Sequence, residues 1–484
     1  MANQIPGPWP LPFIGNLRDI DPGNSIRDMS NLADIYGPIY KLRIGGEDKL
    51  VVTSQKLVHE VCTRKEFVKY PLGFLKQLRN IASEGLFTAY PGEENWGIAH
   101  RTLAPAFGSV SVRNMFPEML DIASQLVMKW ARFGPHYRIN AVQDFTRLTI
   151  DTIALCGMDT RLNSFYTEQV PTYIQAIIEL LSETQHRTYR PWWLTPFMRA
   201  ANRKFNENKQ IVRSVAEDVI ARRRSSLSPE KKDLVDAMLN GTDPKTGKKL
   251  TDEVIIDNMI TFLIAGHETT AGLLSFLFAL LIKNPKAYET LRCEIDRVVG
   301  TAPITADHLK DLAYTKACIW ETLRLHPPAG LWTVTCMDSD TSAPVILANE
   351  WEVKPGQTVL VVVPKLHRDP AVWGEDVEEF KPERMLGSNF SKLPRNSLKP
   401  FGNGQRACIG RAFALQEVTL AIAVLIQKFD FVSADPDYEI SVNQALATKP
   451  HDYFMYAKLR PHLDPLSLQK DIFDNSHNAR DEKA

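Results

Sequence analysis

Residues 401–410 read FGNGQRACIG, a stretch in which one cysteine stands among three glycines and an arginine. Glycine lets the backbone turn tightly and lets a flat partner come close to it. From Ile409 onward the sequence GRAFALQEVTLAIAVLIQKF has the pattern of an amphipathic helix, so Cys408 is expected at the N-terminal end of that helix. Unpaired N–H groups and the helix dipole favour negative charge there, and Arg406 adds a fixed positive charge. The stretch therefore predicts a thiolate.

The chemistry of this thiolate is restricted by what surrounds it. No histidine or aspartate accompanies Cys408 in its own motif, which argues against acyl transfer, whereas a lone thiolate can hold a metal from one side. The other cysteines, at 62, 156, 293, 318 and 336, form no CxxC pair or zinc-type cluster, so we expect small buried hydrophobes. Their wide spacing in 484 residues favours a reducing compartment over a disulfide framework.

The composition is that of a soluble globular protein, with 44% apolar and 24% charged residues. Lysine plus arginine equals aspartate plus glutamate at 57 each, which gives no sign of a partner nucleic acid. The long apolar run 259–282 is interrupted by His267 and Glu268, and ionisable groups are costly inside a bilayer. We therefore predict a cytoplasmic protein without a transmembrane anchor.

Helical patterns dominate the chain. Apolar spacing of about 3.6 residues predicts helices at 116–133, 145–156, 170–183, 204–224 and from about 252 to 282. Strand-like pieces lie at 39–44, 50–53, 359–363 and around 453–458, and 226–250 is a polar surface connection. Residues 1–460 are expected to form one domain, mainly α with small β-sheets, and 461–484 a tail or the start of a linker.

The cysteine motif, Phe401-x-x-Gly404-x-Arg406-x-Cys408-x-Gly410, resembles the haem-binding signature of the cytochrome P450 monooxygenases at every signature position. The resemblance implies that Cys408 is the proximal iron ligand of haem b, iron protoporphyrin IX. It also implies the fold of that family, with a long central helix over the haem and the cysteine loop beneath. Other implied cofactor-binding residues are Phe401, Gly402, Ala265, and Lys69 and Arg406 as propionate partners.

A second motif, AGHETT at 265–270, lies in the longest predicted helix. Ala265 and Thr269 are four residues apart and share one helix face. Cleavage of an O–O bond needs protons delivered by a hydroxyl and an acid in sequence. The resemblance assigns these catalytic roles to Thr269 and Glu268, with O2 as co-substrate. For Thr270 we expect a hydroxyl bonded back to the preceding turn.

Later motifs are assigned structural roles by the same resemblance. Glu321-x-x-Arg324 is an acid–base pair on a predicted helix, and Arg384 follows in the sequence PERM. In the family these three side chains form a buried triad behind the cysteine loop, so we expect them to support folding and haem retention. Trp96-x-x-x-His100 resembles the helix that contacts a haem propionate, where arginine is commoner in the last position.

From about residue 6 to about 458 the chain is similar to the haem domain of the self-sufficient fatty-acid hydroxylases, which share one polypeptide with a diflavin reductase. The implied activity is NADPH-dependent subterminal hydroxylation of fatty acids. FMN, FAD and NADPH would act through a reductase, fused or separate, because this chain has no flavin domain. The implied pocket is apolar, with Phe87 over the haem. Its residues are Leu75, Leu78, Ala82, Phe87, Leu181, Ile264, Ala265, Ala329 and Leu446.

The substrate is open to alternatives. Where the bacterial relative holds a fatty-acid carboxylate with an arginine and a tyrosine, this sequence has Glu47 and Val51. Glutamate repels a carboxylate, so Lys49 or another group would have to anchor it, and alcohols, alkanes or other lipophiles are alternative substrates.

Two alternatives are a peroxide-using peroxygenase or haem isomerase of the same fold, which needs no reductase, and a haem-based sensor or electron carrier. Glu268 and Thr269 argue against the peroxygenase, because such enzymes can dispense with a proton relay. Lys399, Arg406 and Arg411 flank the cysteine loop in sequence, and positive charge there would attract an acidic flavodoxin-like module.

Overall fold

The computed structural model describes residues 4–21, 23–167, 171–190, 192–225, 231–337, 343–444 and 446–461. The chain forms two compact units. The first comprises Met1–Leu72, Trp320–Cys408 and Val442–Thr448, and the second comprises Gly73–Ile319, Ile409–Ser441 and Lys449–Ala484. Apart from residue 461 the expected tail lies outside the described residues, as do residues 226–230 of the expected surface connection. The domain boundary at 460 stays a prediction.

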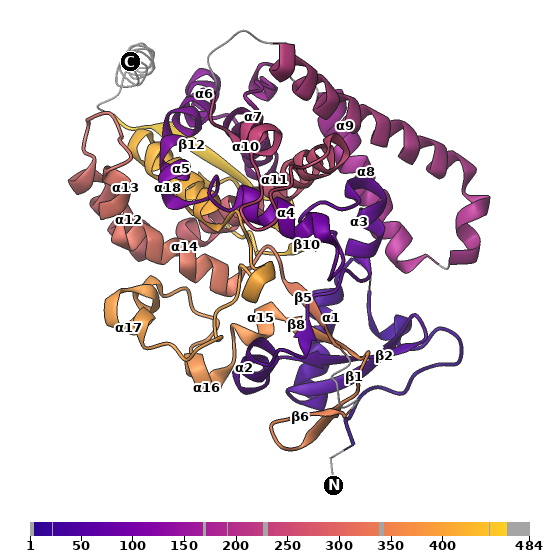
Figure 1. Ribbon diagram of the computed structural model, residues 1–484. Coiled ribbons are helices and arrows are strands. Elements are labelled where there is room, and N and C mark those ends of the chain that lie inside the picture. Colours follow the sequence, from indigo (N-terminus) through magenta and orange to yellow (C-terminus); the bar gives the residue numbers. More distant parts are fainter. Residues whose placement is uncertain are drawn as a thin grey trace. The chain divides into compact units, whose positions relative to one another are not determined.

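The first unit is built on a mixed five-stranded sheet with the order β1-β2-β8-β5-β3 (Figure 1). Strands β2 and β8 are parallel, with Val51 opposite Leu360, and the other pairs are antiparallel. Successive side chains point to opposite faces, so Val361 and Val362 enter two separate apolar clusters. The strands are β1 (Ile39–Ile44), β2 (Glu47–Val52), β3 (Phe67–Val68), β5 (Leu331–Cys336) and β8 (Thr358–Val362).

Helices cover both faces of this sheet. Met29 and Ala33 of α1 (Ser25–Tyr36) join one cluster, and Leu57 and Val61 of α2 (Gln55–Thr63) join the other. The smaller elements of the first unit are η1 (Leu17–Asp19), β6 (Val345–Leu347), β7 (Trp351–Val353), α15 (Val363–Leu366), α16 (Pro370–Trp373), η4 (Pro382–Met385), α17 (Gly387–Ser391), η5 (Gly404–Arg406) and β10 (Val442–Gln444).

The second unit is mainly helical. Its helices are α3 (Phe74–Ala82), α4 (Glu94–Leu103), α5 (Ser109–Asn114), α6 (Phe116–Phe133), α7 (Ala141–Met158), α8 (Thr172–Tyr189), α9 (Arg199–Ser225), α10 (Leu234–Asn240), α11 (Asp252–Lys283), α12 (Pro285–Val298), α13 (His308–Asp311) and α18 (Arg411–Lys428), with 3-10 turns η2 (Ser164–Tyr166) and η3 (Trp192–Phe197). A three-stranded sheet joins β4 (Ile139–Asn140), β12 (Phe454–Leu459) and β9 (Phe429–Ser433). Helix α14 (Ala313–Leu325) and strand β11 (Thr448–Pro450) cross from one unit to the other along the chain.

Helices α7 and α11 pack along each other in the core of the second unit. The Thr251 side chain caps α11 by accepting from the Val254 N–H, and acidic residues occupy its first turn. A Cβ added at Gly266 would lie 3.1 Å from Cγ1 of Ile153 in α7. Glycine at 266 therefore allows the two helices to approach closely, which compensates for its low helix propensity.

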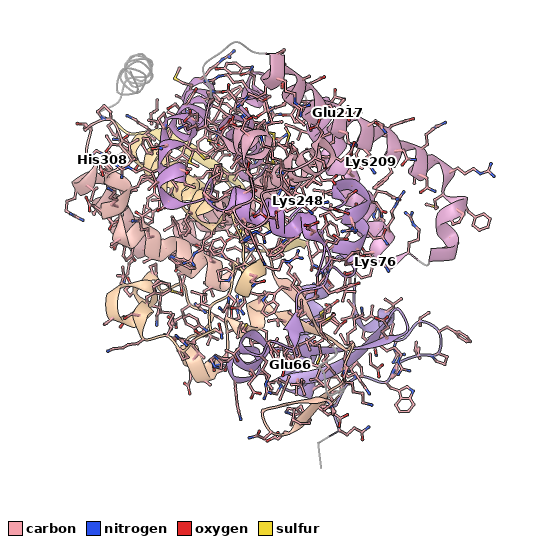
Figure 2. The ribbon with its side chains drawn as sticks, viewed as in Figure 1. Glu66, Lys76, Lys209, Glu217, Lys248 and His308 are labelled. Atoms are coloured by element: carbon pink, nitrogen blue, oxygen red, sulfur yellow. The ribbon has the colours of Figure 1, made fainter. Side chains whose placement is uncertain are left out.

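Helix α11 is long and apolar enough to cross a membrane by length and composition, but 83% of its most apolar window is buried inside the protein. This burial is typical of a core helix, and localisation in the cytoplasm stays a prediction. By contrast α9 is amphipathic: Phe205, Val212 and Val219 are buried, whereas Glu217 is exposed (Figure 2).

The sequence-based assignment of a mainly helical protein with small sheets is confirmed. The predicted bounds agree with β1 and α6 and come within one residue at the end of α11. Helix α7 begins earlier than predicted, at Ala141, and α8 runs on to Tyr189. The expectation that five cysteines are buried is wrong for Cys293, which is exposed, and Cys62 is only half-buried.

Candidate functional site

The loop that carries Cys408 is a tight turn in the first unit. Gly402 and Gly404 have φ values of 73° and 63°, in the left-handed region that strains residues with a Cβ. The Cys408 N–H donates to the carbonyl oxygen of Phe401 across 2.8 Å and closes the turn, while the cysteine as a whole is exposed. Helix α18 begins after Gly410, two residues later in the chain than the sequence predicted. Backbone geometry thus presents an exposed thiol.

Two cations lie within electrostatic range of this thiol. Burial and, to a smaller extent, repulsion by Arg406 lower the pKa of Lys69 to about 8, and attraction to Cys408 opposes both effects. The structure therefore brings Lys69, Arg406 and Cys408 together. Two cations beside a thiol make this part of the loop suited to carboxylate groups.

An aromatic cluster supports the start of the loop. The rings of Trp320 and Phe401 meet edge to face, with centroids 5.8 Å apart, and Trp320 also contacts Phe390 at 5.5 Å. Such pairs contribute roughly 0.5–1.5 kcal/mol beyond the area they bury. The ring of Phe401 therefore packs against Trp320, the residue that precedes Glu321.

His367 ties the cysteine loop to the buried arginine of the same unit. Its Nε2 accepts from the Lys399 N–H at 2.8 Å, and its Nδ1 donates to the Arg324 carbonyl oxygen at 3.2 Å. The side chain is fully buried, and burial, with the charges of Arg324 and Arg368, lowers the pKa of His367 to about 3. The imidazole is thus neutral, with both nitrogens in hydrogen bonds.

Replacing His367 with leucine is expected to destabilise the protein by about 1–3 kcal/mol, because the N–H of the half-buried Lys399 loses its acceptor. The pKa is lowered on folding, so the stability from neutral His367 is fully present above about pH 6.5 and is lost as the pH falls towards 3. Urea unfolding at several pH values would measure this. A His367→Leu protein whose stability falls as steeply in acid as the wild type would contradict the assignment.

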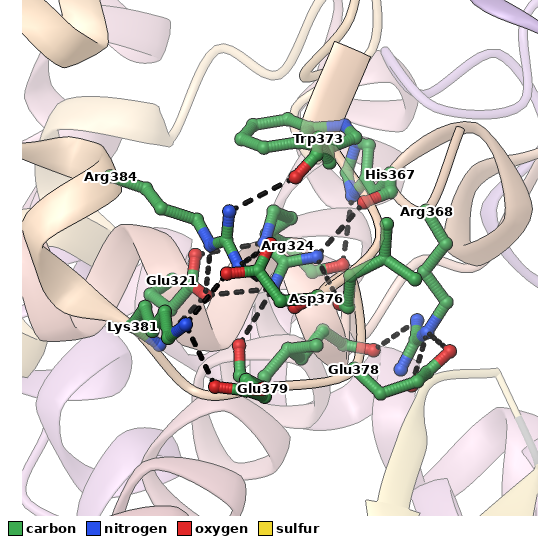
Figure 3. A network of polar contacts seen from close by, with 12 residues as sticks. Glu321, Arg324, His367, Arg368, Trp373, Asp376, Glu378, Glu379, Lys381 and Arg384 are labelled. Carbon is green, nitrogen blue, oxygen red and sulfur yellow. Dashed lines mark hydrogen bonds and ion pairs between the residues drawn. The ribbon is translucent and has the colours of Figure 1, made fainter. Parts of the chain in front are cut away.

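Glu321, Arg324 and Arg384 form a compact network behind this loop (Figure 3). The Arg324 guanidinium donates two hydrogen bonds to the Glu321 carboxylate, at 2.8 and 2.7 Å, and both side chains are fully buried. Arg384 Nε lies 3.6 Å from Oε1 of Glu321, and its other nitrogens donate to the carbonyl oxygens of Trp373 and Asp376. The structure therefore brings the predicted triad together.

Carbonyl groups saturate the rest of the Arg324 guanidinium. It donates to the carbonyl oxygens of His367, Val377 and Glu379, at 3.2, 2.7 and 3.1 Å. The central carbon of the Arg324 guanidinium lies over the Trp373 ring, 5.1 Å from the ring centroid (Figure 3). A buried charge is tolerated only when it is paired and hydrogen-bonded in this way. Arg324 therefore holds the segment 367–379 at three carbonyl groups, and Arg384 holds it at two more.

The middle of α11 has one face that is less buried than the rest of the helix. Every side chain from 254 to 281 is buried except those of Ala265 and Thr269, and Gly266 beside them is also half-buried. The Thr269 hydroxyl donates to the Ala265 carbonyl oxygen at 3.0 Å. Thr269 thus bonds back to the preceding turn, and the same bond at Thr270 stays a prediction. A half-buried Ala–Thr face in an otherwise buried helix is a place where a small molecule can meet a hydroxyl.

Glu268 is a buried carboxylate with two partners from the second unit. Its Oε1 lies 2.7 Å from Nζ of Lys449 and 3.2 Å from Nε2 of His267. Burial raises the pKa of Glu268, but the charge of Lys449 and the contact with His267 outweigh burial, so the pKa is lowered overall. Lys449 also donates to Thr146 Oγ1 at 3.3 Å. Glu268 is therefore an ionised acceptor.

Replacing Lys449 with methionine is expected to raise the pKa of Glu268 and to destabilise the protein by about 3–5 kcal/mol at neutral pH, because a buried charge loses its partner. The lowered pKa contributes stability above about 4.3, the unfolded value, and this stability is lost as the pH falls through the folded value. The difference between Lys449→Met and wild type should therefore shrink below about pH 4.

The double variant Glu268→Gln/Lys449→Met is the matched control, because it removes both charges at once. Denaturant unfolding of wild type, Glu268→Gln, Lys449→Met and the double variant gives the interaction energy between the two side chains. Additive losses at neutral pH would contradict the ion pair.

Trp96 and His100 lie one turn apart on α4, with rings stacked at 5.0 Å and 27°. Arg101 next to them binds the buried Asp243 at 2.6 Å. The stack leaves an indole N–H and an imidazole on one helix face, groups that suit a carboxylate acceptor.

The predicted pocket residues divide between the two units. In the second unit, α3 packs against α8 and α11. Leu78 and Ala82 lie on α3, Leu181 on α8 and Ile264 on α11. These four side chains are at most 5% exposed, whereas Leu75 and Phe87 are half-buried. In the first unit, Ala329 is exposed and Leu446 half-buried.

The β1–β2 hairpin of the first unit carries the positions at which a carboxylate anchor was considered. Val51 is fully buried in the sheet, so it presents no group to a ligand. Lys49 Nζ lies 3.7 Å from Oε2 of Glu47, and Arg43 donates to Asp48 at 2.7 Å. Each of these hairpin cations therefore has an acidic partner within the hairpin.

Sequence reasoning missed His367 and Lys449. Their hydrogen-bond partners lie far away in the chain: 32 and 43 positions for His367, and 181 for Lys449 to Glu268. The only signal was indirect, since a glutamate in an apolar helix needs a cation from elsewhere. Local periodicity does not identify that cation.

The residues on the loop fit a haem. A porphyrin iron brings its own nitrogen ligands and needs one axial donor from the protein, and an exposed thiol on a rigid loop supplies one. No group of three or more His, Cys, Asp and Glu side chains suited to a bare metal ion occurs in the described part of the chain. Lys69 and Arg406 beside Cys408 suit the propionates of a haem. Cys408 would hold the iron and these cations the carboxylates.

Comparison with known proteins agrees with a haem as the cofactor. The family model for cytochrome P450 matches residues 5–455. A bifunctional cytochrome P450/NADPH–P450 reductase of Acremonium egyptiacum is 47% identical over 97% of this chain and 44% of its own length. A self-sufficient cytochrome P450 monooxygenase of Aspergillus terreus is 47% identical over 95% of this chain and 43% of its own length.

A bifunctional cytochrome P450/NADPH–P450 reductase of Fusarium oxysporum is 46% identical over 98% of this chain and 44% of its own length. The chain thus spans less than half the length of the curated relatives it matches. With the signature loop, the buried Glu–Arg network and the family match over nearly its full length, the chain belongs to the cytochrome P450 family, whose cofactor is haem.

Proposed function

We propose that this chain is the haem part of a monooxygenase that inserts one atom of O2 into a subterminal C–H bond of a fatty acid. The second oxygen atom leaves as water, with two electrons derived from NADPH and two protons. The observation that carries the proposal is the closed loop with its exposed Cys408 thiol and the cations Lys69 and Arg406. The family match and the monooxygenase named among the relatives support it.

The haem, when bound, supplies the binding and activation of O2. The protein's part is to position groups. Cys408 is held by the Phe401 carbonyl and by the two glycines of its loop. Behind the loop, His367 and Arg324 keep the chain in place, so the thiolate would not need to reorganise when it binds iron.

Proton transfer would use Thr269 and Glu268. The Thr269 hydroxyl is on the less buried face of α11, where it can give a proton to a small ligand and take one from its neighbour. Glu268 is ionised, so it acts first as an acceptor, and Lys449 holds a proton 2.7 Å away. Protons from solvent would pass to Glu268 and then to the hydroxyl.

The electrons would come from a diflavin reductase carrying FMN and FAD. The names of the relatives from Acremonium egyptiacum and Fusarium oxysporum describe such fusions, and this chain covers under half of either protein. Lys399 and Arg406 beside Cys408 in the first unit are cations suited to an acidic flavodoxin-like module. Rates of haem reduction that do not change with ionic strength would count against this docking.

Neutral lipophiles are the second candidate substrates, because of the β1–β2 hairpin. Lys49 is 3.7 Å from Glu47, so a fatty-acid carboxylate would have to displace that pairing or find another cation. Long-chain alcohols and alkanes carry no charge and meet no such competition. The same chemistry would then act on a chain held by apolar side chains alone.

Turnover assays distinguish these possibilities. The haem-loaded chain is incubated with saturated fatty acids, or with alcohols and alkanes of equal length. Each is tested with NADPH and a diflavin reductase under isotopically labelled O2, and with hydrogen peroxide alone. We expect labelled subterminal hydroxy acids only with the reductase. Equal turnover with peroxide would favour a peroxygenase, and a spectral shift on binding without product would favour a sensor or carrier.

A further inference from the structure

The segment 83–90 is the first part of the connection from α3 to α4 in the second unit, and it carries Phe87. Phe87 is half-buried, whereas its neighbours Thr88 and Ala89 are fully buried. No regular helix or strand holds this segment. Backbone hydrogen bonds close its turns, as between the Thr88 N–H and the Gly85 carbonyl oxygen at 3.0 Å, and side-chain contacts attach it to its neighbours. Those contacts come from two directions, from α11 on one side and from α3 on the other.

Helix α11 holds the residues before Phe87. The Leu86 N–H donates to Oδ1 of Asn258 at 3.0 Å, and the Glu84 N–H donates to Oδ2 of Asp257 at 3.3 Å. Between them, a Cβ added at Gly85 would lie 2.3 Å from Oγ1 of Thr261. The turn therefore lies so close to α11 that only glycine fits at its centre.

Asn258 is fixed in its own right. The residue is 0% exposed, and its amide NH2 donates to the Val254 carbonyl oxygen one turn earlier at 2.8 Å. With the nitrogen so engaged, the side-chain oxygen can only face the turn, where it accepts from Leu86. A buried asparagine with both ends bonded has one orientation.

Helix α3 holds the residue after Phe87. The Thr88 hydroxyl is within 2.9 and 3.0 Å of the carbonyl oxygens of Ala82 and Ser83, and so bonds back to the end of α3. Arg79 Nη1 donates to the carbonyl oxygens of Ser83 and Thr88, at 3.0 and 3.1 Å, and Arg79 pairs with Glu93. Phe87 is thus fixed at the backbone on both sides.

The α11 anchor has a further consequence. Asn258 precedes Ala265 by seven residues, which is two helical turns and about 10 Å along the same side of a rigid helix. The residue that holds Leu86 therefore also has a fixed position relative to the Ala265–Thr269 face. Helix α11 therefore fixes the position of Phe87 relative to the hydroxyl of Thr269.

We propose that Asn258 is a specificity-determining positioning residue. By accepting the Leu86 N–H it fixes Phe87 relative to the Ala265–Thr269 face of α11, and so sets which carbon of the substrate chain is oxidised. The inference rests on the proposed function, because it assumes that Phe87 limits the reach of the substrate. A purely structural role for Asn258 would instead affect stability and leave the products unchanged.

The test uses the haem-loaded chain and four substitutions. Asn258→Leu removes the acceptor of Leu86 at similar volume. Ser275→Ala is the matched control, because Ser275 is a fully buried residue of α11 whose hydroxyl bonds only within the helix, to Ala271 at 2.7 Å. Thr88→Val removes the second anchor of the segment, and Thr88→Ser restores its hydroxyl, which guards against an Asn258 variant that fails to fold.

Two readouts are taken from each protein. Hydrogen exchange of the amides at 84–88 reports, without any turnover, whether Asn258 holds the segment. We expect about five- to tenfold faster exchange in Asn258→Leu, as for loss of one hydrogen bond. Product analysis reports specificity, and we expect the ratio of products at neighbouring carbons to change about threefold or more, with a smaller change in total rate. Thr88→Val should resemble Asn258→Leu, and Thr88→Ser should resemble wild type.

Faster exchange with an unchanged product ratio would overturn the specificity role. Exchange in Asn258→Leu that is no faster than in Ser275→Ala would show that Asn258 does not hold the segment. Absence of hydroxylated product in the wild type would refute the proposed function instead, and the exchange measurement would still decide whether Asn258 holds the segment. The two failures are therefore distinguishable.

Discussion

Arg324→Met is expected to yield protein that retains little haem and unfolds at much lower denaturant concentration, a loss of about 3–5 kcal/mol. The substitution leaves the Glu321 carboxylate buried without its bidentate partner. It also removes the donor to the carbonyl oxygens of His367, Val377 and Glu379, which hold the segment behind the cysteine loop. Haem content per chain and urea unfolding measure the two effects.

Arg224→Met is the matched control, because Arg224 pairs with Asp252 where both side chains are about half exposed, at 54% and 51%. A surface pair of this kind contributes about 0–1 kcal/mol. Arg324→Met that unfolds like Arg224→Met and keeps its haem would contradict the structural role of the network. Glu321→Gln should fall between the two, since it keeps the shape of the acid but not its charge.

Thr269→Val is expected to lower product formation about 100-fold, the lower end of the range for loss of a general acid, while consumption of NADPH falls much less. Valine keeps the volume of threonine and removes the hydroxyl that lies on the less buried face of α11. Electrons that no longer yield product should appear as hydrogen peroxide. The measurement is product and peroxide per NADPH with a diflavin reductase.

Thr270→Val makes the same change one residue along, at a buried position of the same helix, and should leave the yield per NADPH close to wild type. Adding Glu268→Gln to Thr269→Val should cost less than the sum of the single effects, because the two groups act in sequence. Equal yields from Thr269→Val and Thr270→Val would contradict a proton role for Thr269.

Much of the fold follows from periodicity. Helix α6 and strand β1 have the bounds that their apolar spacing predicts, since one face of each element is buried. Helix α7 was predicted too short because its first turn contains Asp144, which an apolar count rejects. That carboxylate is buried and bonded to Lys129 and Trp130 Nε1, so its position depends on partners in another helix.

The error at Cys293 has a physical reason within α12. Leu291 and Ile295 are buried, and residue 293 lies on the opposite side of the helix from both. The expectation rested on the average burial of cysteine rather than on helix phase. The helical positions of Leu291 and Ile295 alone would have predicted that Cys293 is exposed.

The candidate site was predictable where chemistry is local and not where it depends on distant partners. The glycines, Arg406 and Cys408 lie within ten residues, and the sequence indicated a tight loop with a thiol. Glu268 was recognised as an acid, but its charge state depends on Lys449 from strand β11, far along the chain. Nothing in the local pattern specifies that pairing.

The absorption spectrum of the reduced, CO-bound protein tests the central claim most directly. We predict the red-shifted Soret band of a ferrous carbonyl with a sulfur ligand for wild type, and its loss in Cys408→Ser. A wild-type band at the unshifted position of nitrogen-ligated haem would contradict the account. So would a Cys408→Ser protein that keeps the red-shifted band.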